Sequence, residues 1–164
     1  MKHDYLAELL VAGILADNGW NIYFPHRDEG FDFIISKQVD GQEIIRPVQV
    51  KGKYPENLEK RESSYGYHGK LTKVHADMVL AIVFSHKSDE SKTGSSHGVS
   101  TSSNIAFMPF DQLDVSPKGY KCLPAVRDKG EIAIKKGFEM YFNKQGLVLL
   151  EKVKLSQEIT PAHL

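Results

Sequence analysis

Apolar residues crowd the start of the chain and predict a helix from about Tyr5 to Asp17. Asp4 precedes this segment as an N-cap residue, and Asn18 with Gly19 supplies a C-terminal stop. Helical spacing predicts a buried stripe made of Leu6, Leu9, Leu10, Gly13 and Ile14.

The opposite side of the predicted helix is apolar as well, because it carries Val11 and Leu15. We therefore expect the helix to be buried on more than one face. Glu8 falls near these two residues and has two interpretations of equal weight. It is either an acid favoured near the start of a helix by the macrodipole, or a carboxylate directed at a site elsewhere in the fold.

A short apolar segment from Trp20 to Phe24 predicts a strand, and a hairpin follows it. The hairpin arms are residues 30–36 and 46–52, and Asp40-Gly41 between them is a strong turn signal. A regular register places Asp32 directly opposite Gln49 on one face of the sheet, and Lys51 shares that face. Pro47 cannot donate a ladder hydrogen bond, so a bulge there would shift the register.

The rest of the chain predicts further strands around a central one. Residues 78–84 form the most apolar run and predict a strand buried on both faces. Shorter strands are expected at 105–110 and 132–134, a short helix or edge strand at 138–142, and a final apolar segment at 147–153. The expected irregular or helical parts are a short helix at 56–62, a helical turn at 71–76, a flexible loop at 85–103, a turn-rich segment at 111–124 and a C-terminal tail.

This order of elements predicts an α/β fold in which helices flank a central mixed sheet. A chain of 164 residues fits a single domain over 1–164, with a core at about 5–110 and a C-terminal elaboration at 111–164. Cys122 is the only cysteine, so no internal disulfide or cysteine zinc cage is possible. We expect a cytoplasmic protein with no membrane partner, because neither a signal peptide nor a spanning segment is evident.

The formal net charge is zero, which counts mildly against a nucleic-acid partner. The charge is unevenly distributed, however, since residues 1–32 hold six acids against Lys2 and Arg27. Residues 115–154 hold nine lysines or arginines against four acids. The aromatic and glycine-rich segment 65–69 lies beside Lys70 and could follow a nucleic-acid backbone, although a surface loop is the preferred interpretation.

Asp32, Gln49 and Lys51 are polar groups at positions where the neighbours are Phe, Ile and Val, which is typical of a functional site. The alternative is a cross-strand ion pair between Asp32 and Lys51 with a solvated Gln49. Together with Glu8 and the order of elements, these residues resemble the PD-(D/E)XK nuclease superfamily, the restriction-endonuclease-like fold. Within it, the Gln-x-Lys pattern is similar to small intron-associated homing-type endonucleases, and less closely to archaeal Holliday-junction resolvases.

The resemblance implies a metal-dependent DNA endonuclease with a core in αβββαβ order. Its implied catalytic residues are Glu8, Asp32, Gln49 and Lys51, and Mg²⁺, or Mn²⁺ in its place, would be held by Glu8, Asp32, Gln49 and the Val50 carbonyl. Lys51 would orient or help activate the attacking water. Gln49 replaces the acid of the motif and brings no charge, so Glu8 becomes more important.

DNA contacts are expected from Lys53, Lys70 and Lys73. A homo-oligomer, a dimer or larger, is expected because each active site cuts one strand. Two other functions remain open: a non-catalytic nucleic-acid-binding module on the same fold, in which Gln49 is a sign of lost activity, and a protein–protein interaction module.

Overall fold

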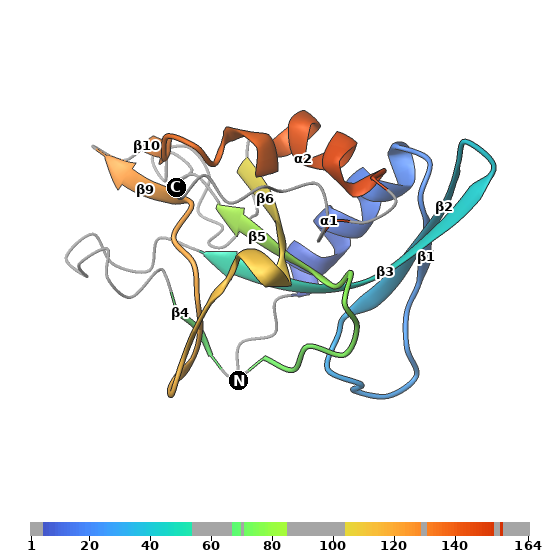
Figure 1. Cartoon of the computed structure of the whole chain (residues 1–164), viewed down its shortest axis with the longest axis horizontal. Helices are drawn as coiled ribbons and strands as arrows, with labels where there is room; N and C mark the ends of the chain where they lie inside the picture. Colours follow the sequence, from blue (N-terminus) through green and yellow to red (C-terminus); the bar gives the residue numbers. More distant parts are fainter. Residues whose placement is uncertain are drawn as a thin grey trace, which may run out of the picture.

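The computed structural model describes residues 5–53, 67–69, 71–84, 104–128, 131–152 and 155. Helix α1 (Tyr5–Asp17) is followed by strands β1 (Asn21–Tyr23), β2 (Phe33–Val39), β3 (Gln42–Lys53), β5 (Val79–Phe84) and β6 (Asn104–Pro109). These strands form one five-stranded sheet in the order β1-β2-β3-β5-β6 (Figure 1). Only β3 and β5 pair in parallel, so the sheet is mixed and the predicted α/β class is confirmed.

One face of this sheet is covered by helices α1 and α2 (Asn143–Leu150), which lie together above it in Figure 1. We call the buried residues of this layer the helix-side cluster. The sheet contributes alternate residues of its strands, and the helices contribute one arc each. Its larger members are Val11, Leu15, Trp20, Phe33, Ile35, Ile44, Val48, Val50, Val79, Val83, Ile105, Phe107, Leu150 and Leu155.

The other face packs against a second buried group, which we call the hairpin-side cluster. Its members are Met78, Leu80, Ile82, Phe84, Ala106, Met108, Phe110, Leu113, Cys122, Ala125, Tyr141 and Phe142. The elements of this layer are short: β4 (Tyr67–Gly69), β7 (Asp114–Ser116), β8 (Gly119–Lys121), β9 (Ala125–Asp128), β10 (Glu131–Ile134), and the 3₁₀ turns Phe110–Gln112 and Glu139–Tyr141. β4, β8 and β7 form one small sheet, and β9 with β10 forms another.

The predicted hairpin is confirmed as β2 and β3. Asp40 and Gly41 have φ angles of 49° and 79°, the paired positive values of a type I′ turn. The register runs without a shift from Val39↔Gln42 to Phe33↔Val48, so no bulge forms at Pro47. Proline is tolerated there because its nitrogen points toward β5, which begins pairing only at the next residue of β3.

The predicted buried stripe of α1 is wrong in its main members, although Leu10 and Ile14 are partly buried against the helix-side cluster. The residues that pack on the sheet are Ala7, Val11, Ala12 and Leu15, whereas Leu6 and Leu9 are more than half exposed. Both arcs of this helix are apolar, so its sequence carries little directional signal. The arc with two alanines lies on the sheet, where small side chains let the helix approach the strands closely.

The bounds of α1 agree with the prediction, and every residue of β5 is buried as expected. The central strand of the sheet is β3, however, and β5 lies between β3 and the edge strand β6. The predicted helical turn at 71–76 is instead irregular and ends in a turn, in which Met78 N–H donates to the carbonyl of His75. The predictions for Asp4, 56–62 and 85–103 fall outside the described residues. Leu155, expected in a tail, is buried. In the described part of the chain, no helix is long and apolar enough to span a membrane.

Candidate functional site

The loop before β2 delivers Asp32 to the sheet. Gly30 has a φ of +83°, which favours glycine, and its N–H donates to the Asp28 carboxylate at 3.1 Å. The chain then joins the sheet, since Asp32 N–H donates to the Val48 carbonyl at 2.8 Å. Regular pairing begins only at Phe33, so Asp32 sits just outside the ladder, with its carboxylate directed along β3.

The Asp32 carboxylate is held by two donors from β3. Its Oδ2 accepts a hydrogen bond from the Val50 N–H at 2.6 Å and another from Gln49 Nε2 at 3.0 Å. The structure thus brings together the Asp32 and Gln49 side chains that the hairpin register predicted. If β2 continued in register past Phe33, Phe31 would accept a ladder hydrogen bond from the Val50 N–H. The Asp32 carboxylate accepts that hydrogen bond instead.

β3 extends to Lys53, five residues past its last pair with β2, Phe33↔Val48. Among the described residues, no strand pairs with the β2-side edge of β3 beyond Val48. In a strand, the N–H and C=O of one residue point to the same edge. Since the Val50 N–H meets Asp32, the Val50 carbonyl also faces the edge that β2 leaves. A carboxylate, an amide and a backbone carbonyl therefore meet at this point of the sheet.

Gln49 and Lys51 point to the hairpin-side face. They are paired in register with Leu80 and Ile82, which belong to the hairpin-side cluster, while Val48 and Val50 belong to the other cluster. Asp32, Gln49 and Lys51 are all partly buried. The predicted common face of these side chains is consistent with this alternation.

Glu8 lies in the first turn of α1 and is partly buried. Its helix packs on the helix-side face, across the sheet from Gln49 and Lys51. A Glu8 carboxylate can join the other predicted ligands only around the edge of β3 that β2 leaves. The structure therefore brings Asp32, Gln49 and Val50 into contact and places Glu8 on the layer behind them.

The oxygens of Asp32, Gln49 and Val50 suit a hard cation, because carboxylate, amide and carbonyl oxygens are the ligands that Mg²⁺ accepts. No group of three His, Cys, Asp or Glu side chains that could hold a metal occurs among the described residues. The predicted set does not require one, since it uses two carboxylates, one amide and one backbone oxygen. Such a set would bring two carboxylate charges to a bound cation.

The lysines predicted to contact DNA have different surroundings. Lys53 ends β3 and is partly buried. Lys73 is exposed and forms an ion pair with Asp111. Lys70 lies outside the described residues.

Sequence reasoning missed Arg46, which is 0% exposed. It lies on the helix-side face, where its Nε donates to the Leu150 carbonyl at 2.9 Å and its Nη2 to the Lys152 carbonyl, at the end of α2. Its Nη1 lies 3.8 Å from the Asp77 carboxylate and has no hydrogen-bond partner in the described part of the chain. Burial lowers the Arg46 pKa to about 10, and the charge of Asp77 opposes that shift. The signal in the sequence was a charged residue at an inward position between Ile44 and Val48.

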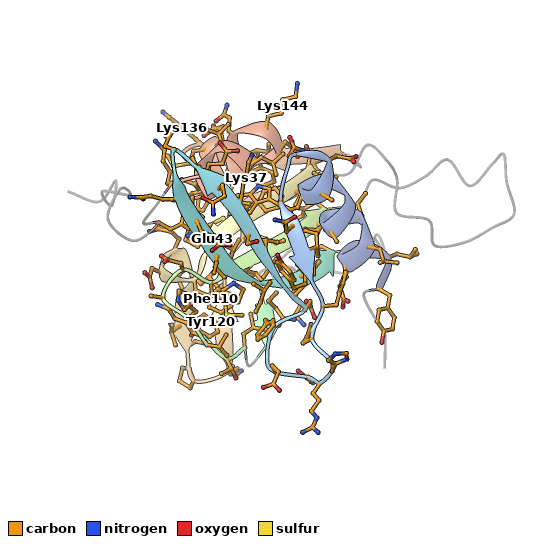
Figure 2. All side chains as sticks on the ribbon, turned by 90° about the vertical axis from the view of Figure 1, so that its right-hand side faces the viewer. Lys37, Glu43, Phe110, Tyr120, Lys136 and Lys144 are labelled. Atoms are coloured by element: carbon orange, nitrogen blue, oxygen red, sulfur yellow. The ribbon has the colours of Figure 1, made fainter. Side chains whose placement is uncertain are left out.

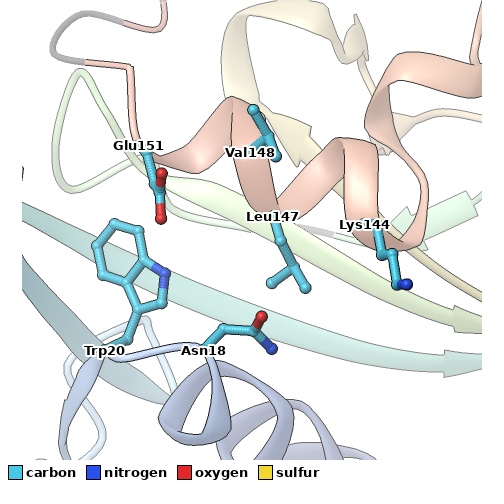
Figure 3. Close-up of a pocket in the computed structure, with 6 residues that line it drawn as sticks. All are labelled: Asn18, Trp20, Lys144, Leu147, Val148 and Glu151. Carbon is cyan, nitrogen blue, oxygen red and sulfur yellow. The ribbon is translucent and has the colours of Figure 1, made fainter.

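A groove lies away from these residues, between the end of α1 and α2. It is lined by Asn18, Trp20, Lys144, Leu147, Val148 and Glu151 (Figure 3). Lys37 closes one side, since its Nζ donates to the Asn18 carbonyl at 2.8 Å and pairs with Glu151. Figure 3 shows the Trp20 indole facing Leu147, and the indole Nε1 is buried without a hydrogen-bond partner among the described residues. None of the predicted site residues lines this groove.

Comparison of the chain with models of known protein families, with curated proteins and with solved structures finds no match. The functional argument therefore depends on the residues at the end of β2 and along β3.

Proposed function

We propose that the protein is a Mg²⁺-dependent DNA endonuclease with a restriction-endonuclease-like core. The observation that supports this most is the Asp32 carboxylate, held by the Val50 N–H and the Gln49 amide beside Lys51. The hairpin places an acid, an amide and a lysine on one face at the end of a strand. Phosphodiester hydrolysis needs such groups, because oxygen ligands hold the metal ion and a cation stabilises the developing negative charge.

In this proposal Asp32, Gln49, the Val50 carbonyl and Glu8 hold Mg²⁺. The ion supplies Lewis-acid stabilisation of charge on the scissile phosphate. The Gln49 nitrogen already donates to Asp32, so its oxygen is the atom that remains to bind a cation. Lys51 steadies the developing negative charge and orients the attacking water through its ammonium group. Each site cuts one strand, so we also propose a homodimer on duplex substrates.

A non-catalytic nucleic-acid-binding module is the second candidate, and one observation favours it. The Asp32 carboxylate satisfies a backbone N–H that β2 leaves without a ladder partner, which is a structural role that needs no metal. Such a module would bind DNA equally well with and without Mg²⁺, and binding would survive Asp32→Ala. A Holliday-junction resolvase would be the same chemistry with a preference for branched substrates.

The deciding experiment measures nicking of supercoiled plasmid, linear duplex, four-way junction and single-stranded DNA with Mg²⁺, Mn²⁺ or Ca²⁺. We expect cleavage with Mg²⁺ and Mn²⁺, and loss of about 10²-fold or more in rate for Asp32→Asn and Lys51→Ala. Binding in Ca²⁺ should remain within a few-fold of wild type for both variants, because each removes a single group at the scissile phosphate and leaves the rest of the duplex contacts in place.

Lys144→Ala is the matched control, since Lys144 is exposed on α2 and stands across the sheet from Lys51. It should cleave at the wild-type rate. The absence of metal-dependent nicking on all four substrates would contradict the endonuclease. Binding that ignores Mg²⁺ and Asp32→Ala would then establish the module instead.

A further inference from the structure

The β7–β8 hairpin is the second notable feature of the face to which Gln49 and Lys51 point. Figure 1 shows it in gold and orange, extending away from the central sheet beside β4, on the opposite side from α1 and α2. Three cross-strand pairs form its ladder, from Asp114↔Lys121 to Ser116↔Gly119. At about 3.3 Å per residue, each arm is roughly 10 Å long.

The hairpin is firmly attached at its base. Leu113 and Cys122, which flank its arms, are both buried in the hairpin-side cluster. The ring of Tyr120 meets the ring of Phe110 edge to face, with centroids 5.3 Å apart. Phe31, the residue before Asp32, packs on the same cluster as Tyr120. The hairpin and the candidate site therefore share one packed layer and one side of the sheet.

The tip is also well defined. The Ser116 hydroxyl donates to the Gly119 carbonyl at 3.0 Å and accepts from the Lys118 N–H at 3.3 Å. Pro117 and Lys118 are exposed at the turn, and Lys121 is exposed on one arm. Such a hairpin presents its side chains at little entropic cost, because its backbone is already ordered.

The hairpin carries exposed positive charge at its turn and on one face, and an exposed apolar residue on the other face. Neither Lys118 nor Lys121 forms an ion pair with any described residue. The acids nearby are Asp114, opposite Lys121, and Asp111, which pairs with Lys73. Val115 is 74% exposed on an arm. Two exposed lysines without ion-pair partners among the described residues are suited to bind the phosphates of a nucleic-acid backbone.

We infer that the β7–β8 hairpin enters the major groove of duplex DNA and fixes the duplex over the candidate site, with Lys118 and Lys121 on its phosphates. This rests on the proposed function. Among the described residues, β4 pairs with β8 only at Tyr120 and Lys121, so the end of the hairpin from Ser116 to Gly119 extends beyond β4 as two chains. A two-stranded ribbon fits the major groove, which is about 12 Å wide and 8.5 Å deep. Phosphate contacts of this kind set the position and register of the duplex, so the hairpin lysines are positioning residues.

The test compares two double variants of the whole protein in which lysine charge is removed without shortening the side chain. Lys118→Gln/Lys121→Gln alters the hairpin. Lys136→Gln/Lys144→Gln is the matched control, because both lysines are exposed and Figure 2 places them at the opposite end of the molecule from Phe110 and Tyr120. Binding of a labelled 30-base-pair duplex is measured in Ca²⁺ by fluorescence anisotropy, from low salt to about 0.2 M salt.

We expect the hairpin variant to bind about tenfold more weakly. The slope of log K against log salt should become less negative by about 1.8, since each lost phosphate contact removes about 0.9 from its magnitude. The control should stay within about twofold of wild type. Single-turnover cleavage at saturating protein should be unchanged in both, because neither variant touches the residues proposed for the chemistry.

Equal binding by the hairpin variant and wild type would overturn the inference, and so would equal weakening of both variants. If wild-type protein binds no duplex DNA at low salt, the proposed function fails and the hairpin inference with it. Thermal unfolding checks that the variants are folded. If the double variant is destabilised, single Lys118→Gln at the exposed tip decides the matter, with an expected slope change of about 0.9.

Discussion

Strand β3 carries polar side chains to both faces of the central sheet, and the two sets have different surroundings. Arg46 on the helix side is completely enclosed, and its guanidinium meets the carbonyls of Leu150 and Lys152 at the end of α2 and the Asp77 carboxylate. Gln49 and Lys51 on the hairpin side are partly buried, at an edge that β2 has left. Arg46 stabilises the fold, whereas Gln49 and Lys51 lie where a ligand could reach them.

The difference shows how a buried polar residue can be assigned. A buried charge must be compensated within the protein, and Arg46 finds acceptors on elements that are distant in the sequence. Asp32 is compensated locally by the next strand, with oxygen donors beside it that a cation could use. Enclosure by distant elements therefore indicates a structural role, and partial exposure at a strand edge indicates a candidate site.

The largest expected effect comes from removing Arg46, the buried polar residue on the helix side. Arg46→Ala leaves the carbonyls of Leu150 and Lys152 and the Asp77 carboxylate without their cation. We expect a loss of about 4 kcal/mol in the free energy of unfolding, the cost of breaking a buried ionic contact. Urea denaturation of the purified variant measures it.

Lys51→Ala serves as the partner experiment on the other face. It should change the free energy of unfolding by no more than about 1 kcal/mol, because Lys51 is only partly buried. If the two substitutions proved equally destabilising, the distinction between a structural and a functional polar set would be lost.

A smaller effect is expected from Gln49→Glu, which restores the acid of the motif. It replaces the donor at 3.0 Å from Asp32 Oδ2 with a second carboxylate oxygen. Like charges at this distance raise the pKa of one carboxyl group. A carboxyl pKa raised in the folded state makes stability fall as pH rises, so we expect about 2 kcal/mol less stability at pH 7 than at pH 5 relative to wild type.

Millimolar Mg²⁺ should restore that stability, because a divalent cation compensates the paired carboxylates. The melting temperature with and without MgCl₂ at both pH values measures the effect. Gln49→Ala is the control, since it removes the same hydrogen bond without adding charge and should show no rescue. A Glu variant indifferent to Mg²⁺ would argue that these oxygens do not converge on a cation.

The smallest expected effect tests whether water is excluded from the hairpin-side cluster, away from the exposed edge of β3. Burial raises the pKa of the Cys122 thiol from 9.0 to about 12, with Asp114 adding to the shift and Lys135 opposing it. Above pH 9 the thiol ionises in the unfolded chain but not in the folded one, so stability falls as pH rises from 9 toward 12. Between pH 8 and pH 10 we expect a loss of about 1 kcal/mol.

Cys122→Ala should lack this loss, and the difference between the two proteins reports the thiol together with its effect on the pKa of Tyr141. Tyr141, whose pKa burial also raises, and Arg46, whose lowered pKa acts in the opposite direction, are present in both. Denaturation curves at pH 8, 9 and 10 supply the measurement. Parallel pH profiles for wild type and variant would mean that water reaches Cys122.

Much of the local structure could be predicted because its signals lie close together in the sequence. Asp40 and Gly41 fix the turn, and a period of two then fixes which residues share a face, so the contact between Asp32 and Gln49 follows. The C-terminal end of α1 follows from the glycine at position 19, whose φ is +88°. The apolar run of β5 predicts a strand enclosed on both sides.

The site was only partly predictable for the same reason. Asp32, Gln49 and Lys51 belong to one hairpin, so a short stretch of chain determines their arrangement. The place of Glu8 depends on how a helix that is apolar on both arcs lies on the sheet, and the predicted arc was the wrong one. The β7–β8 hairpin gave only a turn-rich composition, because its arms have three residues each.

By itself, then, the sequence determined the first helix, the hairpin with its register, and the polar residues that the hairpin brings to one face. Only the tertiary structure decided that β3 pairs in parallel with β5, that α1 lies behind the candidate site and that Arg46 binds the end of α2. The physical reason is range. Turn geometry and strand alternation act over a few residues, whereas burial is shared among segments more than 100 positions apart, as between Arg46 and Leu150.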